Sequence, residues 1–389
     1  MKDFIYNIPT KVYFGKDQMG HLGTELSKYG KRVLLTYGGG SIKKTGLYDQ
    51  AMAEMKKAGL EVFELSGIEP NPRITSVRKG ADMCKEHNID VILAIGGGST
   101  IDASKWIAAG ACVEHDPWDF FTKGAVVEKA LPLVTILTLA ATGSEMNFGG
   151  VISNLETQDK LAASSQLLFP KASFLNPEVT YTVSKYQTAC GSADILSHVF
   201  EIYFNAEGSM FMLDSIMEGL MKTVIKYAPI AIAEPENYEA RANLMWASSW
   251  GISGLIRAVQ TCAWSCHPME HELSAIYDIT HGLGLAILTP RWMEYCLDES
   301  TVDRFVKLGV NVFGIDASLP PMEIAKKAID ATADFLFNKL GLDDTFTKVG
   351  IKEEDFDIMA QKACRKGGCI AGFKTLYAED VKKIFEMCK

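Results

Sequence analysis

Hydrophobic residues in the first half of the chain form short continuous runs separated by amphipathic segments. Four of these runs predict strands, at residues 32–37, 61–68, 90–95 and 133–144. The segments between them have helical periodicity and predict helices, around residues 47–59, 76–88 and 101–111. Continuous Val, Ile and Leu strands that alternate with helices are typical of a parallel sheet covered on both faces. The first half therefore predicts an α/β fold with a doubly wound, mostly parallel sheet.

The hydrophobic pattern changes at about Tyr186, where long stretches of helical periodicity replace the short runs. The clearest of these stretches are residues 193–206, 210–228 and 239–256. A chain of 389 residues also exceeds the size at which one hydrophobic core usually keeps growing. We therefore expect an α/β domain over residues 1–185 and an all-helical domain over residues 186–389, joined in the segment NPEVTYTVSK at 176–185.

The composition argues against several classes of protein. The formal net charge is −9, and no run of Lys and Arg suggests a nucleic-acid surface. The first residues lack the pattern of a signal peptide, and no uncharged apolar run reaches the ~20 residues of a membrane span. Nine scattered cysteines suit a reducing compartment better than a disulfide framework. We expect a cytoplasmic protein that binds neither nucleic acid nor membrane.

Two of the predicted strands end in the same four residues, Gly-Gly-Gly-Ser, at 38–41 and 96–99, and another ends in TLAATGS at 138–144. Glycine lets a phosphate approach the backbone, and a helix N-terminus offers free N–H groups. Such loops at the carboxyl edge of a parallel sheet predict a nucleotide site. Neither Gly-Gly-Gly-Ser segment has the Gly-x-Gly-x-x-Gly fingerprint or a Walker lysine, and glycine-rich turns also occur without a ligand.

The first of these loops bears on the choice of nucleotide. An NAD site generally places a carboxylate after an early strand, where it accepts a hydrogen bond from the ribose 2′-hydroxyl. No carboxylate occurs from Tyr37 to Ser41, and Ser41, Lys43 and Lys44 are positioned to bind a 2′-phosphate. This favours NADP, although lysines beside a loop are also often just solvated.

Three of the seven histidines lie within sixteen residues, in the segment HPMEHELSAIYDITHG at 267–282. His267 and His281 are fourteen positions apart, about 21 Å along an unbroken helix. Metal–nitrogen bonds of about 2.1 Å do not bridge that distance. If both histidines bind one metal, the helix must break within DITHG (278–282), and His281 must lie at the start of the next helix.

Two further pairs have the spacing of one helical face. Asp194 and His198 are four apart, as are His267 and His271. Each residue also has a simpler interpretation. An isolated Asp–His pair of this kind is more often a surface hydrogen bond than a metal site, and His271 could be a satisfied buried histidine. Glu270 is a rival ligand or, more often in such positions, a solvated carboxylate.

Other residues beside the histidines are ambiguous as well. Cys262 and Cys266 near His267 suggest zinc, but no second pair of cysteines completes a structural site. Trp264 is interpreted as packing or as the wall of a pocket. Periodicity and spacing alone leave the metal site open.

Taken together, the motifs resemble the iron-containing (group III) alcohol dehydrogenase family, and within it the butanol dehydrogenase and broad aldehyde reductase branch. The resemblance extends over nearly the full length, and its ordered set of motifs is specific even though each motif alone is weakly so. The motifs are YGGGSIKKTG (37–46), EPNP (69–72), AIGGGSTIDASK (94–105), DPWD (116–119), TLAATGSEMN (138–147), ADILSHVFE (193–201) and HELSAIYDITHG (271–282).

The resemblance implies a dinucleotide-binding domain, a helical metal-binding catalytic domain and a divalent metal in a cleft between them. The implied metal ligands are Asp194, His198, His267 and His281. His271 corresponds to a non-ligand histidine near the nicotinamide that helps to move the proton. The implied cofactor contacts are Gly38, Gly39, Ser41, Gly96, Gly97, Gly98, Ser99, Asp102, Thr138, Thr142, Asn147, Gly149 and Lys160.

The implied reaction is NAD(P)H-dependent interconversion of small primary alcohols, such as butanol, and aldehydes, with Fe2+ or Zn2+ acting as a Lewis acid. Relatives that prefer NAD often have an aspartate where this chain has Gly39, which again favours NADP(H), with NAD(H) possible. Relatives also suggest a homodimer. Two alternatives remain, a lyase of the dehydroquinate synthase type and a non-catalytic nucleotide sensor. The segments around the candidate ligands are apolar and acidic, which favours a small uncharged substrate over the charged substrate of the lyase.

Overall fold

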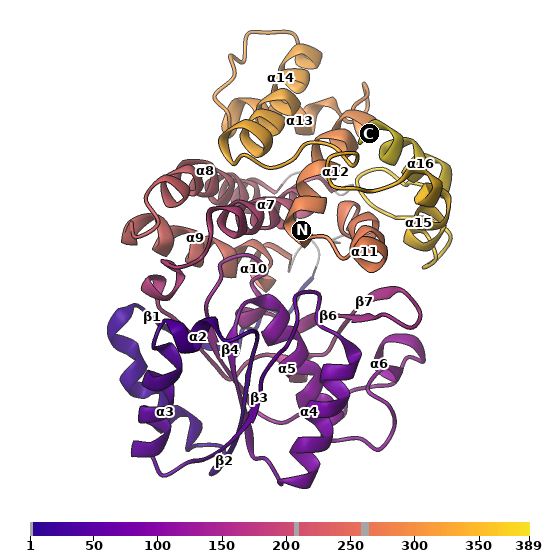
Figure 1. Ribbon diagram of the computed structural model, residues 1–389. Coiled ribbons are helices and arrows are strands. Elements are labelled where there is room, and N and C mark those ends of the chain that lie inside the picture. Colours follow the sequence, from indigo (N-terminus) through magenta and orange to yellow (C-terminus); the bar gives the residue numbers. More distant parts are fainter. Residues whose placement is uncertain (1–2, 206–209, 258–263) are drawn as a thin grey trace. The chain divides into compact units, whose positions relative to one another are not determined.

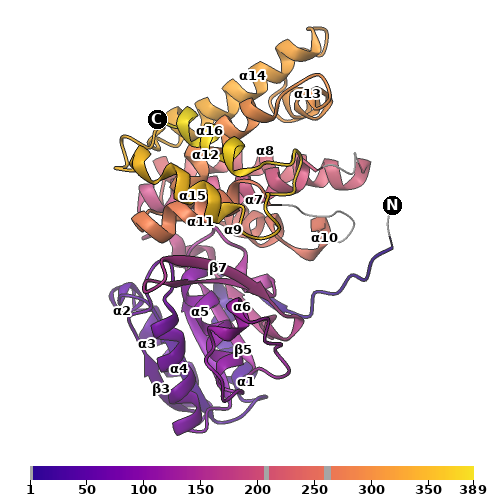
Figure 2. The same cartoon turned by 90° about the vertical axis from the view of Figure 1, so that its right-hand side faces the viewer.

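The computed structural model describes residues 3–205, 210–257 and 264–389. The chain forms two compact units, Asn7–Val183 and Ser184–Lys389, the second together with the first residues of the chain. The first unit is drawn from indigo to purple and the second from pink to yellow (Figures 1 and 2). Each unit has its own buried hydrophobic residues and its own candidate site.

A six-stranded sheet forms the centre of the first unit. Its strands lie in the order β1-β8-β5-β4-β2-β3, and all neighbouring strands are parallel. The strands are β1 (Lys11–Phe14), β2 (Arg32–Tyr37), β3 (Glu61–Leu65), β4 (Val91–Gly96), β5 (Leu133–Leu137) and β8 (Ala172–Leu175). β2, β4 and β5 are buried along almost their whole length, which explains their continuous runs of Val, Ile and Leu.

Helices cover both faces of this sheet (Figure 1). On one face, Leu26 of α1 and Ala51 and Met55 of α3 share a core with strand residues such as Leu35 and Leu93. On the other face, α5 packs against β2, β4 and β5, with α4 beside it. The helices are α1 (Leu22–Leu26), α2 (Ser41–Lys44), α3 (Leu47–Lys57), α4 (Ile74–Glu86), α5 (Gly98–Gly110) and α6 (Asp119–Thr122), with short 3-10 turns at η1 (Lys16–His21), η2 (Ser144–Met146), η3 (Gln166–Leu168) and η4 (Pro177–Thr180).

An antiparallel hairpin, β6 (Gly149–Asn154) and β7 (Asp159–Ser164), accompanies the main sheet. The hydrophobic pattern does not predict it, nor does it predict β1 and β8. The hairpin strands GGVISN and DKLAAS contain residues with low strand propensity. Packing determines them instead: β6 lies against α5 so closely that a Cβ on Gly150 would be 2.8 Å from Trp106 Nε1.

The regular elements of the second unit are all helices within its described residues, apart from an isolated bridge between Ile370 and Leu376. α7 runs through its interior, is buried from Thr188 to Tyr203, and packs against α8, α9 and α12. The helices are α7 (Lys185–Tyr203), α8 (Phe211–Ala233), α9 (Tyr238–Gly251), α10 (Gly254–Arg257), α11 (Cys266–Tyr277), α12 (His281–Cys296), α13 (Val302–Asn311), α14 (Pro321–Asp334), α15 (Phe356–Ala363) and α16 (Ala378–Met387), with turns at η5 (Phe335–Lys339) and η6 (Glu353–Asp355). The predicted combination of an α/β part and an all-helical part is therefore confirmed.

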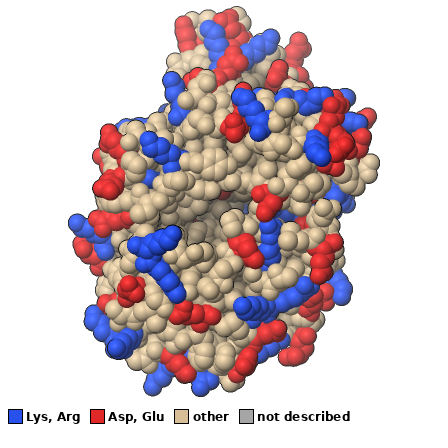
Figure 3. Space-filling model, viewed as in Figure 1, with Lys and Arg blue, Asp and Glu red and all other residues tan. Residues whose placement is uncertain are grey.

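Charged side chains are interspersed on the surface. On the face shown in Figure 3, Lys and Arg alternate with Asp and Glu, and the described residues there form no extended basic area. Within the described parts of the chain, every helix is too short or too polar to span a bilayer.

Candidate functional site

α7 carries two of the candidate metal ligands, Asp194 and His198. Ser184 caps the N-terminus of this helix by accepting a hydrogen bond from the backbone N–H of Gln187. Asp194 and His198 are both buried, and Asp194 Oδ1 lies 3.6 Å from His198 Nδ1. The alternative that they form a surface hydrogen bond is therefore wrong.

The chain breaks between α11 and α12 where the metal hypothesis requires it. Asp278 has φ 52° and ψ 33°, a left-handed conformation common at helix ends, and α12 begins at His281. The ring centroids of His267 and His281 are consequently 5.2 Å apart, instead of about 21 Å along one continuous helix. The predicted order of helix, turn and His281 at the start of the next helix is confirmed.

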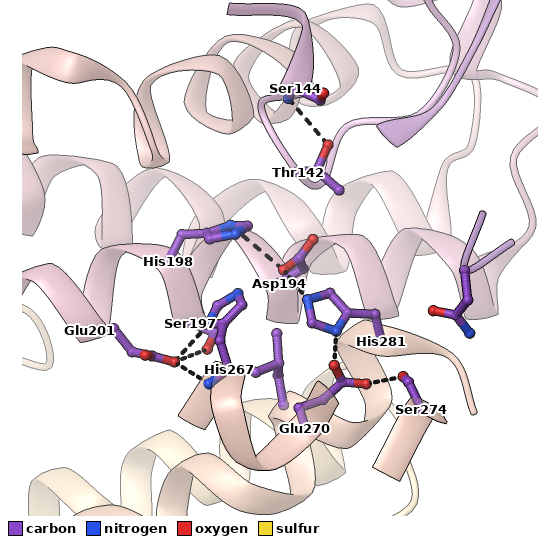
Figure 4. A network of polar contacts seen from close by, with 12 residues as sticks. Thr142, Ser144, Asp194, Ser197, His198, Glu201, His267, Glu270, Ser274 and His281 are labelled. Carbon is purple, nitrogen blue, oxygen red and sulfur yellow. Dashed lines mark hydrogen bonds and ion pairs between the residues drawn. The ribbon is translucent and has the colours of Figure 1, made fainter. Parts of the chain in front are cut away.

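Three side chains from these helices direct ligand atoms to one place. One ligand atom from each of Asp194, His267 and His281 lies within 4.8 Å of the other two. His281 Nε2 is 3.8 Å from Asp194 Oδ1. His198 adjoins this set, because its ring stacks on His267 with centroids 4.8 Å apart. Figure 4 shows Asp194 between His198 and His281. We refer to Asp194, His198, His267 and His281 as the four-residue cluster.

The chemistry of this cluster fits a divalent metal. His267 Nε2 is buried and has no hydrogen-bond partner among the described residues, whereas buried ring nitrogens normally have one. Burial, reinforced by His267 and His281, holds the pKa of His198 well below its usual value, so its ring is neutral. Burial also opposes the charged form of His267, but nearby Glu201 outweighs it and raises the pKa of His267. One carboxylate and three imidazoles suit Fe2+ or Zn2+.

A second set of possible ligands overlaps the first. Glu270, His271 and His281 also have ligand atoms within 4.8 Å of one another. The prediction that Glu270 is a solvated carboxylate is wrong: it is 0% exposed and forms hydrogen bonds with His281 Nδ1 and the Ser274 hydroxyl. Gly284 leaves the space for it, since an added Cβ there would lie 2.8 Å from Glu270 Cγ.

Trp264 and Cys266 flank the cluster. The Trp264 ring centroid is 4.7 Å from that of His267 and 5.8 Å from that of His198, so Trp264 forms one wall beside these rings. Cys266 is buried, and burial raises the pKa of its thiol well above the usual value, which disfavours the thiolate that a zinc site needs. Cys262, the other cysteine considered for zinc, lies outside the described residues.

In the first unit, the three loops predicted to bind a nucleotide follow adjacent strands. β5, β4 and β2 are neighbours and parallel, so the loops after Leu137, Gly96 and Tyr37 lie at the same edge of the sheet. α5 begins at Gly98, directly after β4, and within the described chain no side chain caps its N-terminus. The N–H groups and the dipole of this helix end therefore suit an anion such as a pyrophosphate.

Close packing requires glycine at positions 96 and 98 of the loop after β4, but it does not require glycine at position 39 in the loop after β2. A Cβ on Gly98 would lie 2.4 Å from Thr142 Cγ2, and a Cβ on Gly96 would lie 2.4 Å from Thr100 Oγ1. Around an added Cβ at Gly39, by contrast, no heavy atom of the described residues lies within 4 Å. The first loop therefore has room for a larger side chain or a ligand group.

Lys105, at the end of the AIGGGSTIDASK motif, is a further site residue that the sequence does not single out. It is 0% exposed, and its Nζ donates to Ser144 Oγ (2.9 Å), Asn147 Oδ1 (2.7 Å) and the Gly149 carbonyl (2.7 Å). Burial lowers the pKa of Lys105 to about 8, although neighbouring Asp102 raises it. These bonds fix the loop before β6 onto α5. Lysine side chains are usually exposed, so the sequence alone does not predict that Lys105 is buried or that it makes these contacts.

Two predicted cofactor-site lysines have partners within the first unit. Lys160 lies buried on β7 and donates to Asn71 Oδ1 at 3.0 Å. Lys43 lies 3.6 Å from a carboxylate oxygen of Glu64 and over the ring of Tyr48, 4.5 Å from its centroid. Lys43 is therefore partly neutralised by an acidic neighbour rather than merely solvated.

The family of the chain follows from comparison with known proteins. The model of the iron-containing alcohol dehydrogenases matches residues 9–177, and that of the C-terminal part of the Fe-containing alcohol dehydrogenases matches residues 188–388. The chain belongs to the iron-containing alcohol dehydrogenase family. The family resemblance seen in its motifs is thereby confirmed, and both candidate sites lie in the matched regions.

Proteins that are similar to this chain include dehydrogenases and a reductase. The chain is 52% identical over 387 residues to NADH-dependent butanol dehydrogenase A of Clostridium acetobutylicum, with 99% of each chain covered. It is 36% identical over 365 residues to the NADPH-dependent aldehyde reductase YqhD of Escherichia coli, with 93% of each covered. The crystal structure of NADH-dependent butanol dehydrogenase A from Thermotoga maritima is similar with a TM-score of 0.95 and 38% identity, covering 100% of this chain and 99% of that one.

Proposed function

We propose that the protein catalyses the NAD(P)H-dependent, metal-dependent interconversion of small primary alcohols, such as butanol, and their aldehydes. The observation that carries the proposal is the convergence of Asp194, His267 and His281 on one place, where the chain breaks between two helices. Relatives named butanol dehydrogenase and aldehyde reductase support the same reaction class. They do not favour the lyase or sensor alternatives.

The residues have separate tasks in this proposal. A bound divalent metal would supply Lewis acidity toward the substrate oxygen, and the nicotinamide would supply or accept the hydride. Membership of the family favours Fe2+ as this metal, and the ligand set of one carboxylate and three imidazoles also suits Zn2+. The four-residue cluster would hold the metal. The α5 N-terminus and the glycine-rich loops would bind the pyrophosphate. The partly buried ring of Trp264 and the neutral ring of His198 would present an apolar, uncharged surface to the reacting end of the substrate, which suits a small uncharged molecule.

In terms of the two units, residues 1–185 would form the dinucleotide-binding domain and residues 186–389 the metal-binding catalytic domain. We also propose that the protein forms a homodimer and is located in the cytoplasm. Sedimentation equilibrium of the purified protein tests the first, and fractionation of the source cells tests the second.

Transfer of deuterium tests the reaction class. The protein is incubated with butyraldehyde and with NADPH or NADH that carries deuterium at both hydrogen positions of nicotinamide C4, and the product is analysed by mass spectrometry. We expect butanol with one deuterium on its alcohol carbon. Nucleotide binding without deuterated butanol would contradict the proposal and would favour a lyase or a sensor.

Cofactor preference is predicted to depend on Gly39. We infer a preference for NADPH, because the first loop has no carboxylate and has open space at Gly39, while the relatives' names include both cofactors. Gly39→Asp would add a carboxylate that repels a 2′-phosphate and accepts from a 2′-hydroxyl. We expect the ratio of kcat/KM for NADPH to that for NADH to fall by roughly tenfold or more, equivalent to about 1.4 kcal/mol. Gly39→Asn is the uncharged control, and an unchanged ratio in Gly39→Asp would contradict this inference.

His271 is predicted to move a proton rather than to bind the metal. His271→Ala should lower kcat by roughly 10²- to 10⁴-fold, the usual contribution of an acid–base group, while the metal content stays unchanged. Turnover and metal content of the same preparations are the measurements. Loss of the metal in His271→Ala would instead favour the set of Glu270, His271 and His281 as the ligands.

A further inference from the structure

Glu201 connects the two helices that carry the candidate ligands. It lies on α7 and is 2% exposed. Its Oε2 accepts from the backbone N–H of Ser265 (2.6 Å), and its Oε1 accepts from the backbone N–H of His267 (3.0 Å). Ser265, the N-cap residue of α11, makes no capping bond of its own. Glu201 therefore caps α11 from a different helix and holds the first turn of α11 against α7.

The same carboxylate also orients an imidazole ring. Glu201 Oε1 lies 2.7 Å from His267 Nδ1. Asp194, His198 and Glu201 follow one another at spacings of four and three, so they lie on one face of α7. α7 thus carries two candidate ligands, Asp194 and His198, and also Glu201, which orients the third ligand, His267 (Figure 4).

Glu270 makes the corresponding contact with His281. Its Oε2 is hydrogen bonded to His281 Nδ1, and its Oε1 accepts from the hydroxyl of Ser274. Glu270 is fully buried on α11, one turn before Ser274. His267 and His281, which lie in the first turns of α11 and α12, therefore each face a buried carboxylate through Nδ1.

A carboxylate at Nδ1 determines which nitrogen carries the proton. Nδ1–H donates to the carboxylate, so the lone pair of the neutral ring lies on Nε2. His267 Nε2 is buried and lacks a hydrogen-bond partner among the described residues, and His281 Nε2 lies 3.8 Å from Asp194 Oδ1. Carboxylates in this arrangement orient a metal-binding histidine and raise its basicity.

We propose that Glu201 and Glu270 are positioning residues that fix the Nδ1–H tautomers of His267 and His281 and so direct both Nε2 atoms to the same metal. This inference rests on the metal centre of the proposed function. It goes beyond that function because it assigns a role to two carboxylates that bind neither metal nor substrate.

Metal affinity tests the inference with a matched control. The full-length protein is stripped of metal, and the dissociation constant of Zn2+ is measured by competition with a chromophoric chelator for wild type, Glu201→Gln, Glu270→Gln and Glu272→Gln. Glu272 is an equally buried carboxylate of α11, but it pairs with Lys362 and Arg365 instead of a histidine. We expect the dissociation constant to rise about 10- to 100-fold in the first two variants and to stay unchanged in Glu272→Gln.

The tautomers themselves provide a readout that needs neither metal nor turnover. With ¹⁵N-labelled histidine in the metal-free protein, His267 and His281 should give the signals of Nδ1–H tautomers, and each signal should change in the glutamine variant of its own partner. A general loss of structure would instead change both signals in both variants. Unchanged Zn2+ affinity in both variants, an equal loss in Glu272→Gln, or Nε2–H tautomers in the wild type would each overturn the inference. If the Zn2+ affinities and the tautomers are as expected but the protein does not reduce butyraldehyde, only the proposed function is overturned.

Discussion

We expect His267→Ala to remove the metal and nearly all turnover while the protein stays folded. His267 belongs to a set whose ligand atoms lie within 4.8 Å of one another, and its Nε2 is buried without a hydrogen-bond partner in the described chain. A Lewis-acid metal contributes several kcal/mol to the transition state, so a loss of about 4 kcal/mol, or roughly 1,000-fold in kcat, is expected. The metal content is measured by inductively coupled plasma mass spectrometry, and kcat on the same samples.

Two further variants make the His267→Ala result specific. His115→Ala alters a histidine whose side chain is 37% exposed and that lies in the other unit, and it should leave the metal content and kcat unchanged. Circular dichroism should show the same helical content in all of these proteins. Full metal content in His267→Ala would mean that the four-residue cluster is not the metal centre.

We expect Gly282→Ala to disrupt the four-residue cluster although Gly282 is not itself a ligand. Gly282 is the second residue of α12, directly after His281, and a Cβ there would lie 2.0 Å from the carbonyl oxygen of Cys190 in α7. A backbone carbonyl inside a helix cannot rotate away, so α12 must move from α7. We expect the free energy of unfolding to fall by about 1–3 kcal/mol, the usual cost of overpacking. Because α12 carries His281 and α7 carries Asp194, metal affinity should fall as well.

The control for Gly282→Ala is another helical glycine with free space around it. On Gly219 of α8, an added Cβ meets no heavy atom of the described residues within 4 Å, so Gly219→Ala should be neutral or stabilising by up to about 1 kcal/mol. Urea unfolding and Zn2+ competition are measured on both variants. Equal stability of Gly282→Ala and wild type would contradict the close contact between α7 and α12.

Much of the fold could be predicted from the sequence because periodicity reports burial. The continuous Val, Ile and Leu runs identify β2, β4 and β5, which are buried in the sheet. The break before His281 could be predicted because the length of a helix and of a metal bond are both fixed. In contrast, β6 and β7 have low strand propensity, and tertiary packing rather than local sequence determines them.

The supporting residues of the site were the hardest to predict, for a physical reason. Glu201, Glu270 and Lys105 are ionisable residues of helices, and such residues are exposed in most proteins. Glu201 and Lys105 are buried here with partners from distant parts of the chain, such as the N–H groups at the start of α11 for Glu201, and Glu270 is buried with His281, which lies beyond the break between α11 and α12. These contacts join different helices, so spacing within one helix does not predict them, whereas the ligand pair Asp194 and His198 has the i, i+4 spacing of one helical face.

The most direct test of the metal centre is a titration of the metal-free protein with Fe2+ under anaerobic conditions, with butyraldehyde reduction measured at each step. If Asp194, His198, His267 and His281 form one catalytic metal centre, activity should rise in proportion to added metal and reach its plateau at one ion per chain. The same titration of His267→Ala should show neither tight binding nor activity. Full activity of the metal-free protein, or a plateau that His267→Ala reproduces, would contradict the account.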